Sequence, residues 1–243
     1  MFRSTLIASL MLASPLAAQM EMTDAEREAF RQEVRSYILD NPEVLMEAIA
    51  ILEQRQADAQ AQADTDMLAA NAEALYEDDF SWVGGNPDGD ITIVEFLDYR
   101  CGYCKRAFPE VEALIASDGN IRLIIKEFPI LGEQSVLASQ FAIATKQVAG
   151  DEAYKAVHDT LMEYRGDVTE PALVRIGETL GLDTDAILAQ MTSPEVTDII
   201  SRNRALGNRL AINGTPSFVI DDQLVRGYMT LDMMRQLVAQ ERI

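Results

Sequence analysis

Two cysteines, Cys101 and Cys104, are the only thiols among 243 residues, and they lie two residues apart. They follow an apolar, β-branched run at 91–98 and precede a helical pattern at 105–116. A thiolate that attacks a disulfide needs a second thiol to resolve the resulting mixed disulfide. The spacing places both sulfurs on one helical turn, so it predicts a redox pair.

The position of each cysteine predicts its role in this pair. Cys101 would lie at the helix N-terminus, where unpaired N–H groups and the helix dipole lower the pKa of a thiol. We therefore expect Cys101 to be the nucleophile and Cys104, one turn further in, to be the resolving thiol. A bridge between them would close a very short loop, which makes a purely structural disulfide a poor explanation. Without a histidine between the cysteines, we expect a reduction potential below the ~−120 mV of the strongest oxidants.

Glu95 stands alone as a carboxylate on the otherwise apolar strand pattern before Cys101. Burial of an unpaired ionised carboxylate is costly. Two interpretations stay open: an ion pair with a basic residue such as Lys126, or a proton acceptor for Cys104 during its attack.

The elements around the cysteines predict an α/β domain at residues 78–243. A Gly- and Pro-containing turn cluster at 79–90 marks its start, and helical periodicity at about 134–212 predicts an inserted helical domain. Pro109 is expected to kink the helix that begins at the cysteines. The expected strands are 91–98, 121–128, 217–220 and 223–226, with a last helix from about 231.

Two segments carry a resemblance to a known family: the run from Glu95 to Cys104, and Gly214-Thr215-Pro216-Ser217-Phe218. Together with the helical insertion, they resemble the DsbA-type thiol–disulfide oxidoreductases, which have a thioredoxin fold. The resemblance implies a redox-active Cys101–Cys104 disulfide with no other cofactor, and a cis-proline at Pro216. It also implies that Gly102, Tyr103, Thr215 and Pro216 contact the substrate.

Residues 19–77 predict a helical arm and spacer ahead of that domain. An amphipathic helix from about Thr23 to Leu39 and a second after Asn41-Pro42 carry apolar stripes, and 53–66 is a polar spacer. The arm is similar to the N-terminal stalk of the suppressor-of-copper-sensitivity C proteins, which implies a homotrimer. A dimer through residues 20–76, or helices that fold back on the domain, are the alternatives.

Residues 1–18 read as a cleaved secretory signal, with Arg3 at the basic start, an apolar stretch and small residues at Ala17-Ala18. Export to the periplasm would let a disulfide persist. Loss of Arg3 leaves 19 Lys and Arg against 40 Asp and Glu, a net charge of −21. This charge excludes nucleic acid as a partner and favours solubility.

The leading functional prediction is a periplasmic disulfide isomerase or reductase that acts on misoxidised or unfolded exported proteins and is kept reduced by a membrane partner. The Cys-Gly-Tyr-Cys motif is also that of the isomerase DsbC. A disulfide-forming oxidase and a copper-tolerance protein that binds Cu(I) at Cys101 and Cys104 are the alternatives. No metal site is otherwise expected. His158 is interpreted as an ordinary helical residue, the sequon at Asn213 is discounted, and the eleven methionines are assigned to apolar faces.

Overall fold

The computed structural model describes residues 22–242, which form two compact units divided between Gln56 and Ala57. The expected signal at 1–18 lies outside the described residues. Because the division falls after Gln56, the second unit begins earlier than Asp78, the expected start of the domain. Within 22–242, no helix is both long enough and apolar enough to cross a membrane.

The first unit consists of helix α1 (Asp24–Asp40) and the first part of helix α2 (Glu43–Ala70). A capping box starts α1: the Thr23 hydroxyl accepts from the Glu26 amide, and the Glu26 carboxylate accepts from the Thr23 amide at 2.8 Å. No residue of α1 is buried. The apolar side chains of this unit are therefore exposed; the larger ones are Phe30, Val34, Tyr37, Leu39, Leu45, Met46, Ile49, Ile51 and Leu52.

The end of α2 belongs to the second unit and packs against it. Leu68 is 3% exposed, and the buried Asp64 carboxylate accepts two hydrogen bonds from the Arg226 guanidinium, each 2.9 Å long. The short helix α3 (Ala72–Tyr76) follows and buries Leu75. The segment 53–66, predicted to be a solvated spacer, is therefore partly docked on the domain.

The second unit is built on a five-stranded mixed sheet with the order β1-β3-β2-β4-β5. Strands β2 and β3 are parallel, and the other neighbouring strands pair antiparallel. The strands are β1 (Trp82–Gly85), β2 (Ile91–Leu97), β3 (Ile121–Glu127), β4 (Ser217–Ile220) and β5 (Gln223–Arg226). The four strands predicted from the sequence are all present.

Strand β1 was not predicted, because its sequence reads as part of a turn cluster. The Trp82 ring lies over Gly84, where an added Cβ would come within 2.0 Å of a ring atom. Gly85 has a φ of +69°, which side chains rarely adopt. The glycines that hide this strand from a sequence pattern are thus the residues that let Trp82 pack on it.

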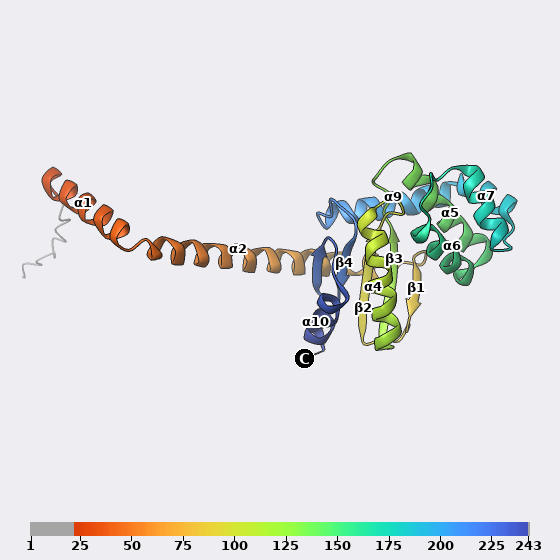
Figure 1. Ribbon diagram of the computed structural model, residues 1–243, viewed down its shortest axis with the longest axis horizontal. Helices are drawn as coiled ribbons and strands as arrows, with labels where there is room; N and C mark the ends of the chain where they lie inside the picture. Colours follow the sequence, from red (N-terminus) through yellow and green to blue (C-terminus); the bar gives the residue numbers. More distant parts are fainter. Residues whose placement is uncertain (1–21, 243) are drawn as a thin grey trace, which may run out of the picture. The chain divides into compact units, whose positions relative to one another are not determined.

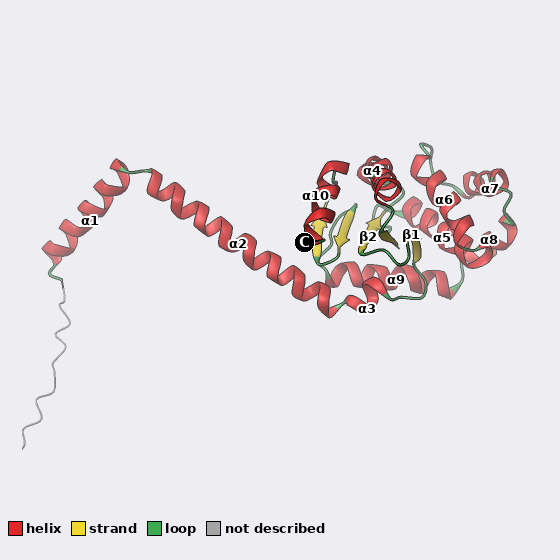
Figure 2. Cartoon of the chain, turned by 90° about the horizontal axis from the view of Figure 1, so that it is seen from below, coloured by secondary structure: helices red, strands yellow, loops and turns green. Residues whose placement is uncertain are grey.

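Helices cover both faces of the sheet (Figure 2). Helix α4 (Gly102–Asp118) and helix α10 (Leu231–Glu241) pack on one face, and α3 and α9 (Pro194–Arg209) pack on the other. The insertion predicted at about 134–212 also contains α9, so its last helix packs on the sheet, while its other helices lie beside the sheet (Figure 1): α5 (Glu133–Ala149), α6 (Asp151–Glu163), α7 (Glu170–Thr179) and α8 (Thr184–Met191). Pro109 lies inside α4, which stays one continuous helix.

Each face of the sheet has its own apolar core. The face under α4 includes Ile93, Leu97 and Ile125, whereas Phe96 and Ile124 belong to the face under α9. Side chains alternate along a strand, so neighbouring residues of β2 and β3 point to opposite faces. This alternation decides which charged residues of the two strands can reach the cysteines.

Candidate active site

The loop between β2 and α4 is held by the buried carboxylate of Asp98. Its Oδ1 accepts from the amide of Arg100 at 2.7 Å, and its Oδ2 accepts from the amides of Ile130 and Leu131 at 2.8 and 3.0 Å. The Asp98 carbonyl also accepts from the Cys101 amide at 3.0 Å. Asp98 therefore fixes the start of α4 and joins it to the loop after β3.

Cys101 is the N-cap residue of α4 and is 7% exposed. Its sulfur accepts from the Cys104 amide at 3.4 Å and lies 3.1 Å from the Thr215 carbonyl, to which it donates only when it is protonated. A hydrogen bond from the Cys104 thiol, opposed by burial and aided by bonds from Thr215 and nearby amides, lowers the pKa of Cys101 to about 5. This sulfur therefore carries a negative charge at neutral pH, as a nucleophile requires.

Cys104 lies one turn into α4 with no exposed surface. Burial, together with its hydrogen bond to the Cys101 sulfur and repulsion by Glu95, raises the pKa of the Cys104 thiol far above its usual range. Both cysteines are free thiols in this structure. The two sulfurs thus differ strongly in acidity although they share one helical turn.

The loop that faces the cysteines comes from the distant segment before β4. The peptide bond between Thr215 and Pro216 is cis. Ser217 donates from its hydroxyl to the Gly214 carbonyl at 2.9 Å, and the Gly227 amide donates to the Pro216 carbonyl at 2.9 Å. These bonds hold Thr215 against Cys101, so the structure brings together the two motifs of the sequence.

The dipeptide between the cysteines lies open at the surface. No atom lies within 4 Å of the position that a Cβ at Gly102 would take, and Tyr103 is 61% exposed. The Tyr103 ring lies 6.3 Å from the Tyr228 ring, over which the Arg106 guanidinium packs at 4.8 Å. The surface beside Cys101 is therefore open over Gly102 and bordered by these aromatic rings.

Glu95 lies on the α4 side of β2 and is 3% exposed. One oxygen of its carboxyl, Oε1, has no hydrogen-bond partner. Burial, with repulsion by Glu112, Cys101 and Glu127, raises the pKa of Glu95 to about 8. A protonated carboxyl at neutral pH explains how this group is tolerated in the core.

The predicted alternative, an ion pair between Glu95 and Lys126, is wrong. Lys126 pairs with Phe96 in the register of β2 and β3, on the opposite face of the sheet from Glu95. There its ammonium group binds the Asp78 carboxylate and the Ala74 carbonyl. Because side chains alternate between the two faces of a sheet, the Lys126 ammonium group points away from Glu95 and cannot reach it.

A buried polar cluster around Glu127 was not predicted. Its Oε1 accepts from the hydroxyls of Tyr99 and Tyr154 at 2.7 and 2.6 Å, and its Oε2 accepts from the Ser139 hydroxyl at 2.7 Å. His158 is buried as well, and its Nδ1 lies 3.1 Å from the Tyr99 hydroxyl. His158 is thus more than the ordinary helical residue that the sequence suggested. The sequence does show a carboxylate, Glu127, at the end of an apolar strand. It does not show the hydrogen-bond partners of this carboxylate, because they come from three other segments of the chain.

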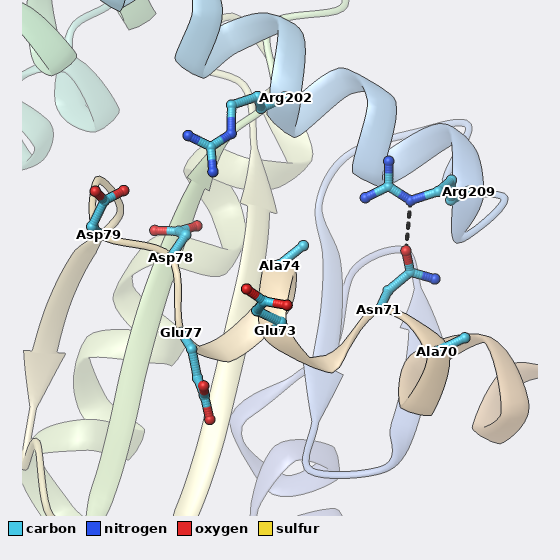
Figure 3. Close-up of a pocket in the computed structure, with 9 residues that line it drawn as sticks. All are labelled: Ala70, Asn71, Glu73, Ala74, Glu77, Asp78, Asp79, Arg202 and Arg209. Atoms are coloured by element: carbon cyan, nitrogen blue, oxygen red, sulfur yellow. Dashed lines mark hydrogen bonds between the residues drawn. The ribbon is translucent and has the colours of Figure 1, made fainter.

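The described residues contain no group of three or more His, Cys, Asp or Glu side chains that could hold a metal ion. A cavity of about 660 Å³ opens between α3 and α9, on the sheet face opposite the cysteines (Figure 3). Acidic side chains of 73–79 line one side, and Arg202 and Arg209 the other. This cavity is separate from the thiol site.

The comparison with protein families covers most of the second unit. The family described as the DSBA-like thioredoxin domain matches residues 92–239, which include both cysteines and Pro216. This chain is a DsbA-like thioredoxin-domain protein. Its residues 92–239 accordingly form a thioredoxin-fold domain of the DsbA-like thiol–disulfide oxidoreductase family. A second family, the copper resistance protein ScsC N-terminal domain, matches residues 26–59.

Solved structures resemble this DsbA-like protein over different shares of its chain. A thioredoxin-like oxidoreductase from Silicibacter pomeroyi DSS-3 is 42% identical, with 70% of this chain and 96% of that chain covered and a TM-score of 0.66. A Proteus mirabilis ScsC mutant with a linker deletion is 27% identical, with coverages of 93% and 99% and a TM-score of 0.68. Salmonella enterica Typhimurium BcfH is 27% identical, with coverages of 89% and 96% and a TM-score of 0.73.

Curated relatives of the DsbA-like protein differ in length. The Na(+)/H(+) antiporter NhaA 1 of Salinispora arenicola is 26% identical over 157 residues, but the match covers only 24% of that protein. The chain therefore spans about a quarter of such relatives. Disulfide bond formation protein D of Bacillus subtilis is 22% identical over 170 residues, which cover 75% of it.

Proposed function

We propose that this DsbA-like protein is an exported disulfide isomerase and reductase that acts on unfolded or misoxidised proteins. The observation that carries the proposal is the contrast between the two sulfurs: an acidic Cys101 below an open Gly102 and an inaccessible Cys104. An easily ionised nucleophile with a buried resolving thiol suits a protein that attacks substrate disulfides in its reduced form.

The proposed reaction starts when the Cys101 thiolate attacks a substrate disulfide. A bond forms between Cys101 and one substrate sulfur, and the other substrate sulfur leaves as a thiolate. In isomerisation, a substrate thiolate then attacks the mixed disulfide and releases Cys101 unchanged. In reduction, Cys104 attacks the Cys101 sulfur, the substrate thiolate leaves, and a Cys101–Cys104 disulfide forms.

Two groups assist these steps. The main chain of Thr215, beside the cis-proline Pro216, lies next to the Cys101 sulfur and offers an edge for an extended substrate strand. Gly102 and Tyr103 form the facing surface. In the mixed disulfide Cys101 carries no charge, so its repulsion no longer raises the pKa of Glu95 and more of this carboxyl is ionised. The ionised Glu95 then takes the proton of Cys104 as that sulfur attacks.

The arm supports self-association as a homo-oligomer through residues 20–76, with a trimer as the expected state and a dimer as the alternative. The stripe of Phe30, Val34 and Tyr37 follows helical spacing along α1, and these side chains are 59%, 39% and 56% exposed. Contiguous apolar surface of this kind marks a protein interface. An oligomer would place several Cys101 sites around one substrate.

Export to the periplasm and a membrane partner that reduces Cys101–Cys104 complete the proposal. The name of a similar solved structure, a periplasmic thioredoxin-like protein from Salmonella enterica serovar Typhimurium, supports this location. Its chain is 27% identical and 94% covered.

Two other functions have specific support. The relatives called disulfide bond formation protein D favour a disulfide-forming oxidase. The match of the arm to a copper resistance family favours Cu(I) bound by Cys101 and Cys104, because soft thiolates suit Cu(I).

The direction of the reaction is tested with ribonuclease in two starting states. The reduced full chain should reactivate scrambled ribonuclease. The oxidised chain should oxidise reduced ribonuclease at a rate lower than this rate of reactivation. Cys101→Ser should abolish both activities. Fast oxidation of reduced ribonuclease without reactivation of scrambled ribonuclease would identify an oxidase. Cu(I) binding at submicromolar concentration without either activity would identify a copper protein.

A further inference from the structure

Glu127 is a buried charge that the thiol chemistry described above does not use. Three hydroxyl groups, from Tyr99, Tyr154 and Ser139, converge on its two carboxyl oxygens at 2.6–2.7 Å. Each of these hydroxyls acts as a donor, and an ionised carboxylate is a pure acceptor. The geometry therefore suits a negatively charged Glu127.

No cation contacts this carboxylate in the described residues. The single hydroxyl hydrogen of Tyr99 points to Glu127, so Nδ1 of His158 is the donor in its 3.1 Å contact with the Tyr99 oxygen. Burial lowers the pKa of His158 to about 3, so the ring stays neutral. The charge of Glu127 is thus stabilised by dipoles alone and acts on its surroundings without a counter-ion.

Glu95 is the neighbouring carboxyl on the same face of the sheet. In the register of β2 and β3, Glu95 pairs with Ile125 and Leu97 pairs with Glu127. The two glutamates are therefore diagonal neighbours with Cα atoms roughly 8 Å apart. Glu127 has three donors, whereas Oε1 of Glu95 has none, so Glu127 ionises before Glu95.

We propose that Glu127 is a positioning residue whose negative charge adds to the basicity of Glu95, the group that takes the proton of Cys104. The proposal rests on the proposed role of Glu95 as proton acceptor. Glu127 touches neither sulfur nor substrate, and it acts only through Glu95. Burial is the main cause of the raised pKa of Glu95, and repulsion by Glu127 adds to it after that of Glu112 and Cys101. Burial also raises the pKa of Glu127, to about 7, but the three hydroxyl donors oppose this, so Glu127 ionises more readily than Glu95.

Other charged and titratable groups also face this pair. From α4 these are Cys101, Cys104 and Glu112, and from the loop before α4 they are Asp98 and Tyr99. Helix α6 contributes Tyr154, His158 and, beyond the histidine, Lys155. Among these groups, Lys155 is the one cation, and it binds Glu112 and Asp159. Glu127 remains the carboxylate that shares the strand pair with Glu95.

The test is a titration of Glu95 by carbon NMR of carboxyl-labelled glutamate in the reduced full chain, with Glu95→Gln to assign the signal. Glu127→Gln keeps the cluster, because its amide oxygen accepts from both tyrosines and its amide nitrogen donates to the Ser139 oxygen. The midpoint of Glu95 should fall by about one pH unit in Glu127→Gln. Glu163→Gln, at an exposed site, should leave it unchanged.

Tyr154→Phe provides a second variant if Glu127→Gln does not fold. Loss of one donor makes Glu127 harder to ionise, so the midpoint of Glu95 should again fall, by less than in Glu127→Gln. An unchanged Glu95 midpoint in a folded Glu127→Gln or Tyr154→Phe protein would overturn the proposal.

A kinetic measurement separates this inference from the proposed role of Glu95. Release of a trapped mixed disulfide, followed against pH, should reach a plateau rate at least threefold lower in Glu127→Gln, because the ionised Glu95 is a weaker base there, and its midpoint should move to lower pH. If Glu95→Gln releases the mixed disulfide as fast as the wild type, the proton-acceptor role fails. The NMR midpoint then still reports whether the charge of Glu127 acts on Glu95.

Discussion

At the scale of single residues, the chemistry of the site follows from where each sulfur lies on α4. At the start of the helix, the Cys101 sulfur accepts hydrogen bonds from the Cys104 thiol and amide, which lower its pKa. One turn later, Cys104 is buried and is repelled by Glu95, and both effects raise the pKa of its thiol. One helical turn therefore separates an acidic thiol from one that holds its proton. The division of roles needs no additional catalytic group.

Alkylation of the reduced protein by iodoacetamide measures this division. Cys101 should react at a rate that stays constant from pH 8 down to about pH 6 and falls at lower pH, because its pKa is lowered to about 5. Mass mapping should find Cys104 unmodified in the folded protein. A half-maximal rate near pH 8.5, as for an ordinary cysteine, would contradict the assignment.

Asp98 provides a stability prediction at this scale. Asp98→Ala removes the buried carboxylate that accepts three amide hydrogen bonds and leaves these part-buried N–H groups without that partner. We expect a loss of about 2–4 kcal/mol in the free energy of unfolding by urea. Asp88→Ala, at an exposed turn residue, should change it by less than about 0.5 kcal/mol. Equal effects of the two changes would show that the Asp98 bonds do not hold the loop.

Functional residues that stand in a short sequence motif could be predicted. Contacts between residues from distant segments of the chain could not. The CxxC spacing and the Thr215-Pro216 pair could be found because their residues stand in a short motif. The contacts of Asp98 with Ile130 and of Glu127 with Tyr154 join different segments, so no local pattern reports them. The wrong prediction of a Glu95–Lys126 ion pair has the same origin, because the register of β2 and β3 places Lys126 on the opposite face of the sheet from Glu95.

At the scale of elements, the periodic segments were predictable and the irregular ones were not. The inserted helices have clear apolar spacing and caps, whereas β1 contains two adjacent glycines in four residues. The polar sequence of 53–66 concealed its docking, because the contact within this segment is an ion pair, Asp64 with Arg226, and the apolar contact of Leu68 comes only after it. Arg226 also donates to the Leu210 carbonyl at 3.1 Å.

Asp64→Ala tests whether this ion pair fastens the end of α2 to the domain. Amides of residues 57–66 should exchange with deuterium at least tenfold faster in the variant, with a stability loss of about 1–2 kcal/mol. Asp66→Ala, two residues along on the exposed side, is the matched control. Unchanged exchange in Asp64→Ala would show that apolar contacts such as Leu68 suffice.

The same ion pair should respond to pH. Hydrogen bonds from Arg226 lower the pKa of Asp64 in the folded state. Its stabilising contribution is therefore complete above the unfolded carboxyl range and is lost as the pH falls through the lowered value. Exchange of 57–66 in the wild type should accelerate at acid pH, and the rates of wild type and Asp64→Ala should converge there.

At the scale of the whole molecule, the protein combines a redox domain with an arm whose apolar face has no partner within the described chain. The DsbA-like domain supplies thiol chemistry that serves oxidation, reduction or isomerisation equally well. In the proposed function, self-association through the arm places several nucleophiles around one substrate, which favours rearrangement of disulfides over simple release. The proposed isomerase activity therefore depends on the arm, whereas reductase activity depends on the domain.

The most direct test of this account compares the wild type with Val34→Glu in the reactivation of scrambled ribonuclease, with the mass in solution measured on the same samples. Val34→Glu places a charge in the apolar stripe of α1, and Gln32→Glu adds the same charge on the other side of that helix as the control. We predict that Val34→Glu is a monomer that reduces insulin at the wild-type rate but reactivates scrambled ribonuclease at least tenfold more slowly. A monomeric Val34→Glu protein with full reactivation activity would contradict the account.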